Sequence, residues 1–186
     1  MPNKGENIMT ENKAKITTIR LTVAALFMAM NIAMSSFGVP VPGGHLYLCD
    51  IVICTAALLL NPFEAFLVGG IGSFLGDMIF YPTPMFVSLV THGLQALVIS
   101  LVAHKTFKKH PKIAAGIGVS IGVIIMVAGY TFGKAFIYST VEYAIMKLPY
   151  EFAQGIIGAV FGMLLVFGFG IKKLFNKVVN DKEKQG

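Results

Sequence analysis

Polar side chains that could bind a small ligand interrupt otherwise apolar segments of this sequence. His92 and Gln95 lie on one helical face near the middle of such a segment, and Tyr130 and Lys134 are four positions apart near the end of another. Polar groups inside a bilayer are costly to bury, so each is a candidate for function. Together they predict a polar pocket at one end of the apolar segments. The candidate binding residues are His45, Tyr47, Asp77, His92, Gln95, Tyr130, Lys134, Glu151 and Gln154.

The expected pocket combines aromatic rings with a few polar groups, which is typical of sites for a small, flat, water-soluble molecule. Residues 39–47 contain two prolines and two adjacent glycines and predict an irregular loop that roofs the pocket. For His92 and Gln95 two interpretations stay open. They either make a hydrogen bond between helices or contact the ligand.

Four other positions have simpler structural interpretations. We interpret Asp50 as a helix N-cap, because an aspartate there satisfies free backbone N–H groups. Glu64 follows Asn61-Pro62 and is interpreted as a charge in the first turn of a helix. Cys49 and Cys54 lie in one apolar run without a CxxC pair, so we interpret them as packing residues.

Nothing in the sequence predicts catalysis. It contains no HExxH or GxxxxGK[ST] motif. A metal centre needs three or four converging ligands, and Asp77 with His92 falls short of that number. We therefore expect no catalytic residue, no metal and no cofactor in this chain. Transport of a ligand against a gradient would then need energy from a partner protein or an ion.

The composition predicts a protein embedded in lipid. Of the 186 residues, 55% are hydrophobic and only 13% are charged, and the mean hydropathy is +0.74. A soluble domain of this size is about one quarter charged, because its surface faces water. The net charge of +6 is explained by clusters of lysine that set membrane topology and contact anionic lipids, so we expect no nucleic-acid partner.

Six apolar segments, at residues 21–37, 46–60, 63–80, 85–103, 113–132 and 152–171, predict an all-α integral membrane protein with six transmembrane helices in one bundle. With six spans, 13 of the 15 basic residues fall on one side, which the positive-inside rule makes cytoplasmic. Both termini are then cytoplasmic. The chain forms one domain, with a polar N-terminus (1–20), the bundle (21–171) and a basic tail (172–186).

Small residues recur every four positions in several segments, which lets another helix approach closely. Most of these stripes predict packing inside the bundle. Not every stripe can point inward, however, and one could be a docking face for another membrane subunit. Ala25, Ala29 and Ala33 form such a stripe in the first segment.

The order and spacing of short motifs across the six segments resemble those of a known family. They are VPVPGGHLYLCD at residues 39–50, Asn61-Pro62, GSFLGD at 72–77, THGLQ at 91–95, Gly129-Tyr130 and PYEFAQG at 149–155. Over residues 17–172 the chain resembles the substrate-binding S components of energy-coupling factor (ECF) vitamin transporters, in the branch with hydroxymethylpyrimidine- and riboflavin-type members.

The resemblance implies a protein in the cell membrane of a prokaryote that captures a vitamin outside. It also implies three partner proteins, a T component in the membrane and two cytosolic ATPases. The ATPases, not this chain, would bind and hydrolyse ATP. In that family an alanine-rich face on the first helix docks onto the T component, and Ala25, Ala29 and Ala33 match it.

The resemblance does not by itself identify the ligand. In the related pattern a lysine is frequent at the position of His92, an asparagine at that of Glu151, and an acidic residue near that of Lys134. Hydroxymethylpyrimidine or a vitamin B6 form is the preferred ligand, with riboflavin or pantothenate as alternatives. Two alternatives to an S component also remain open. The protein could be a stand-alone ion-coupled transporter or a membrane assembly protein without a ligand.

Overall fold

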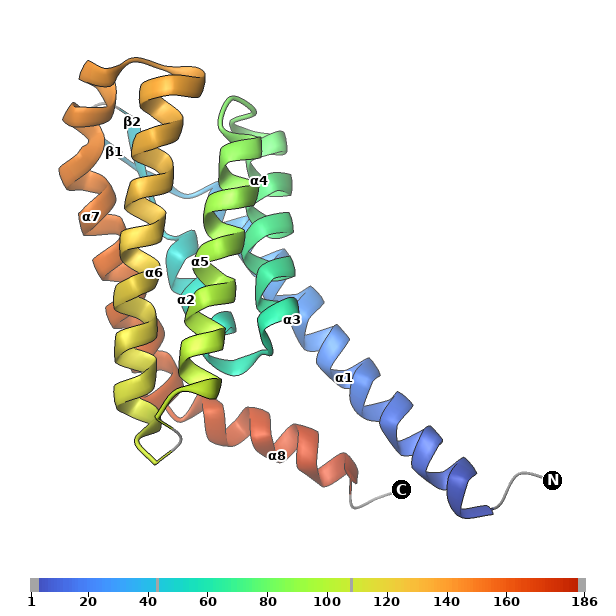
Figure 1. Cartoon of the computed structure of the whole chain (residues 1–186). Helices are drawn as coiled ribbons and strands as arrows, with labels where there is room; N and C mark the ends of the chain where they lie inside the picture. The colour runs from blue at the N-terminus through green and yellow to red at the C-terminus, as the bar shows by residue number, and fades with distance from the viewer. Residues whose placement is uncertain (1–3, 43, 108, 184–186) are drawn as a thin grey trace.

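A computed structural model describes residues 4–183 except 43 and 108 (Figure 1). The fold is a helical bundle with one small β-hairpin. Its elements are α1 (Lys4–Ser35), β1 (Gly38–Val41), β2 (Gly44–Tyr47), α2 (Cys49–Leu59), α3 (Pro62–Phe66), η1 (Leu67–Ile71), α4 (Gly72–Phe80), α5 (Met85–Lys105), α6 (Pro111–Gly133), η2 (Lys134–Tyr138), α7 (Val141–Met163), η3 (Leu164–Gly168) and α8 (Ile171–Glu183). The η segments are single π-helical turns that continue α3, α6 and α7.

Within the described residues, five helical stretches are long and apolar enough to cross a membrane: Thr18–Ser35, Pro62–Phe80, Met85–Lys105, Pro111–Tyr138 and Val141–Gly168. A crossing of about 30 Å needs about 20 helical residues. The remaining predicted segment contains α2, which has 11 residues and is too short for this by itself. The chain is therefore a multi-pass helical membrane protein with five full-length candidate spans.

The predicted irregular loop at residues 39–47 is wrong. The strands β1 and β2 form an antiparallel hairpin in which Gly38 pairs with Tyr47 and Val41 with Gly44. Pro42 lies in the turn between the strands, and position 43 lies outside the described residues. Gly44 has a φ of +123°, a backbone conformation that glycine adopts readily and other residues rarely adopt.

The predicted start of the last segment is also wrong. Helix α7 begins at Val141 rather than at 152, because the Thr140 side chain caps it by accepting a hydrogen bond from the Tyr143 N–H. Pro149 lies inside this helix. The basic tail begins as a separate helix, α8, which runs across the end of the bundle (Figure 1).

Helix α2 is the centre of the bundle and packs against α1, α5 and α7. Its side chains are buried on all sides, including Ile53, Cys54 and Leu58. A mostly apolar helix is suited to such a central position. Close approach of α7 depends on glycine, because a Cβ atom at Gly158 would lie 2.5 Å from the Asp50 Cβ.

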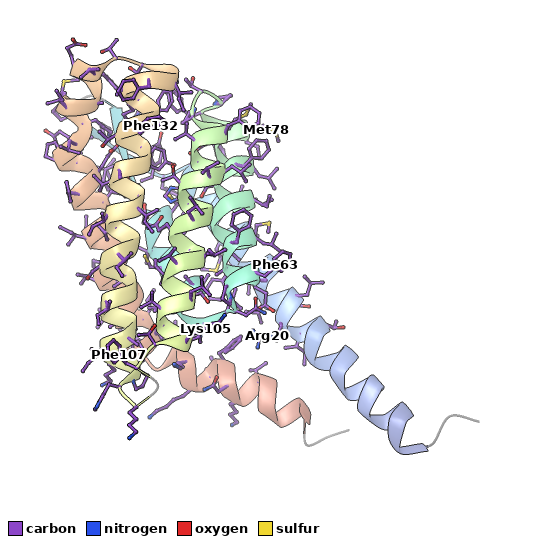
Figure 2. All side chains as sticks on the ribbon, in the orientation of Figure 1. Arg20, Phe63, Met78, Lys105, Phe107 and Phe132 are labelled. Atoms are coloured by element: carbon purple, nitrogen blue, oxygen red, sulfur yellow. The ribbon has the colours of Figure 1, made fainter. Side chains whose placement is uncertain are left out.

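The outer surface of the bundle is apolar, as expected for contact with lipid. Phe63 of α3, Met78 of α4 and Phe132 of α6 are exposed, and their side chains project from the bundle in Figure 2. The alanine stripe of α1 belongs to this surface, because Ala25, Ala29 and Ala33 are all exposed. The small residues of α6 and α7, in contrast, are mostly buried against neighbouring helices.

Candidate ligand-binding site

A cavity of about 360 Å³ lies at the hairpin end of the bundle. It is lined by side chains from the hairpin and from α4, α5, α6, η2 and α7. Eight of the nine residues predicted to bind a ligand line it: His45, Tyr47, Asp77, His92, Tyr130, Lys134, Glu151 and Gln154. The ninth, Gln95, is fully buried behind the cavity wall.

Asp50 holds this wall together, and its interpretation as an N-cap is wrong. The helix is capped at Leu48 without a side-chain hydrogen bond, and the Asp50 carboxylate points into the bundle, where it is 1% exposed. Oδ1 accepts a hydrogen bond from Gln95 Nε2 at 2.8 Å, and Oδ2 accepts one from Gln154 Nε2 at 2.7 Å. A buried carboxylate needs such donors, because burial without them is costly.

The hydrogen bonds of Asp50 determine how His92 faces the cavity. Because a carboxylate can only accept, Gln95 must turn its NH₂ group toward Asp50 and its carbonyl oxygen toward His92. That oxygen lies 2.6 Å from His92 Nδ1, so Nδ1 carries the proton. In the neutral ring Nε2 is then left as an acceptor. Gln95 thus makes the hydrogen bond between helices, while His92 contacts the cavity.

A second chain of hydrogen bonds orients Tyr130. The Ser88 hydroxyl donates to the Asp77 carboxylate and lies 2.5 Å from the Tyr130 hydroxyl. Since the single Ser88 proton is used by Asp77, Tyr130 must donate to Ser88. The Tyr130 ring also packs edge-on against His92, with ring centroids 5.2 Å apart. Helices α4, α5 and α6 therefore present one connected surface to the cavity.

A buried ion pair joins the opposite wall. Lys134, in the π-helical turn η2, pairs with Glu151 of α7, and both side chains are almost fully buried. The ammonium group of Lys134 lies 4.8 Å from the centre of the Tyr130 ring, which is a cation–π contact. A π-helical turn shifts the direction of the side chains that follow it and is frequent at functional sites.

Helix α7 also attaches the hairpin over the cavity. Lys147 Nζ donates to the His45 carbonyl oxygen at 2.5 Å, and Gln154 Oε1 accepts from the Tyr47 N–H at 2.9 Å. Partial burial raises the pKa of the Tyr47 phenol above its ordinary value, so this group stays protonated and can donate. In the described residues the sheet consists of β1 and β2 alone, and a two-stranded hairpin is only marginally stable by itself. The hairpin therefore depends on these contacts with α7 for its position.

Comparison with known proteins gives the family. Residues 15–172 match the sequence profile of the family described as the ECF-type riboflavin transporter, S component. The chain belongs to this family. It is thus a transporter S component of a vitamin-uptake system, as the resemblance of the motifs predicts.

Two relatives of this S component are informative. It is 29% identical over 151 residues to the thiamine precursor transporter HmpT of Lactococcus lactis subsp. cremoris, covering 78% of this chain and 84% of HmpT. It is 31% identical over 134 residues to an uncharacterized protein in a gap 3′ region of Pyrococcus woesei, covering 71% of this chain and 85% of that protein.

Several lining residues of this S component were missed by sequence reasoning. Lys147 precedes Glu151 by four positions, a spacing that places both on one helical face, but the predicted last segment begins only at 152. Asp50 lies behind the lining, and its role is revealed by hydrogen bonds to Gln95 and Gln154 rather than by the local sequence. Cys49 lines the cavity, whereas Cys54 lies in the hydrophobic core as expected of a packing residue.

Donor atoms of Cys49, Asp50 and His92 lie within 4.8 Å of one another. Each Asp50 oxygen accepts a carboxamide donor, and His92 Nδ1 faces Gln95, so these three atoms already have hydrogen-bond partners. That the S component holds no metal stays a prediction.

Removing one partner of the Lys134–Glu151 pair is expected to destabilise the S component. Lys134→Met leaves Glu151 buried without its cation, a change that costs about 3–5 kcal/mol in folded proteins. The double variant Lys134→Met/Glu151→Gln removes both charges and should recover much of the thermal stability. Thermal unfolding of the purified proteins in detergent measures both. Equal stability of the single variant and the wild type would show that this pair does not hold η2 against α7.

Proposed function

We propose that this S component binds a small, uncharged pyrimidine with amino and hydroxyl substituents, of the hydroxymethylpyrimidine type. The observation that carries the proposal is the balance of charge around the cavity. Asp77 and Glu151 supply two carboxyl groups and Lys134 and Lys147 supply two amines. Because an unpaired charge in such a site is costly, a neutral ligand fits this set better than an anion such as pantothenate.

The hydrogen-bonding groups suit the same class of ligand. His92 Nε2 offers an acceptor for an exocyclic amino group, and Lys147 offers donors to ring nitrogens or a hydroxyl. Tyr130 and Tyr138 border the cavity and offer surfaces for a flat ring. The similarity to HmpT, named as a thiamine precursor transporter, supports this choice. Vitamin B6 forms share these features, and riboflavin is the ligand in the description of the family.

The proposed topology has six membrane segments, with α2 as a short segment enclosed by the others. The hairpin end faces outward and the α8 end faces the cytoplasm, because lysines concentrate at the α8 end. A vitamin then enters under the hairpin. We propose a prokaryotic cell membrane as the location, a T component and two cytosolic ATPases as partners, and ATP use only by those ATPases.

The binding site is tested by calorimetric titration of the purified protein with hydroxymethylpyrimidine, pyridoxine and riboflavin in turn. We expect hydroxymethylpyrimidine to bind most tightly. In the His92→Ala variant a buried polar group of the ligand loses its partner, at about 1–3 kcal/mol, or roughly five- to over a hundred-fold in affinity. His110→Ala is a matched control, because His110 is exposed in the loop before α6.

Two results would contradict different parts of this proposal. Tighter binding of riboflavin would reject the pyrimidine but keep the cavity as the site. Equal affinity of the His92→Ala and wild-type proteins for every ligand would reject the site itself.

The alanine stripe of α1 is the proposed docking face for the T component, since it is exposed and lets a partner helix approach closely. Ala29→Trp should abolish co-purification with the T component and leave vitamin affinity within about twofold, because the substituted side chain faces away from the bundle. Pull-down and titration of the same preparation measure both. A complex that survives this substitution would rule out the stripe.

A further inference from the structure

A second cavity, of about 340 Å³, lies at the opposite end of the S component from the hairpin. It is bordered by α1, by the turn between α2 and α3, by the end of α5 and by α8. Its polar lining is basic or neutral and consists of Arg20, Asn61, His104, Lys172 and Asn176. Arg20 and Lys105 mark this end of the bundle in Figure 2.

The cations of this cavity are only partly used within the protein. Among the described residues, Arg20 donates from Nε and Nη2 to the Glu64 carboxylate at 3.0 and 2.9 Å, and its Nη1 group is left for another acceptor. Lys172 lies 5.4 Å from the centre of the Phe167 ring. Within the part of the chain whose side chains are described, no carboxylate is within ion-pairing distance of Lys172. The cavity therefore has an excess of positive charge.

Helix α8 has the pattern of a helix that lies in a membrane interface. Phe175 packs against the core of the bundle, while Leu174 and Val178 remain 62% and 44% exposed. Lys173 and Lys177 are exposed on the same helix. The helix runs across the long helices rather than along them (Figure 1). A helix with apolar residues and lysines in this orientation binds anionic lipid surfaces.

We propose that this second cavity binds the phosphate group of an anionic phospholipid. Lys172 and the free edge of Arg20 would contact the phosphate, while Leu174 and Val178 of α8 would lie against acyl chains. The group that this cavity recognises is a phosphate. The exposed apolar residues beside the cavity favour a phosphate that belongs to a lipid over free inorganic phosphate. This site is separate from the vitamin cavity and does not depend on which vitamin is bound.

Native mass spectrometry of the full-length protein in dodecyl maltoside tests this site, with added phosphatidylglycerol or phosphatidylcholine. We expect selective retention of phosphatidylglycerol, about fivefold weaker in Lys172→Gln. Lys109→Gln is the matched control, because it removes a lysine from the exposed basic loop at the same end without touching the cavity. If Lys172→Gln does not fold, Asn176→Asp, which places a carboxylate in the cavity, should weaken retention to a similar extent.

Equal retention of the two lipids would overturn the proposal, as would equal losses in Lys172→Gln and Lys109→Gln. Inorganic phosphate at millimolar concentration provides the remaining comparison. If it displaces phosphatidylglycerol and alone raises the unfolding temperature of the wild type but not of Lys172→Gln, the site binds free phosphate and the assignment to a lipid is wrong.

Discussion

The rest of the structure depends on a carboxylate that is buried in the centre of a membrane protein. Asp50 cannot reach water, so both of its oxygens need donors from neighbouring helices, and Gln95 and Gln154 supply them. Each glutamine then has only one way to turn. The oxygen of Gln95 sets the proton of His92, and the oxygen of Gln154 holds the hairpin backbone. One buried acceptor thereby fixes both a wall and the cover of the cavity.

The same physical constraint governs the remaining charges. Lys134 and Glu151 neutralise each other within the bundle, and Asp77 receives its hydrogen bond from Ser88. Each of these contacts joins two helices that are far apart in the sequence or separated by a turn. A ligand that carried its own net charge would disturb this balance. A neutral ring with donors and acceptors can use the same groups without leaving a charge unpaired.

Much of the bundle and eight of the residues that line the cavity could be predicted from the sequence. Apolar length and the scarcity of charge are strong signals in lipid, and polar residues within such segments are few. The hairpin was missed because its strands are short and rich in proline and glycine, a composition that is also typical of loops. The role of Asp50 was missed because its partners lie 45 and 104 positions away. The residue pattern within one helix carries no information about hydrogen-bond partners on other helices.

The central claim is that the cavity selects a neutral, substituted pyrimidine. Mass spectrometry of the small molecules retained by the protein after purification from cells tests it most directly. The account predicts a pyrimidine with amino and hydroxymethyl groups, in about one equivalent, and much less of it on the His92→Ala protein. Recovery of pantothenate or another anion in its place would contradict the charge argument on which the claim rests.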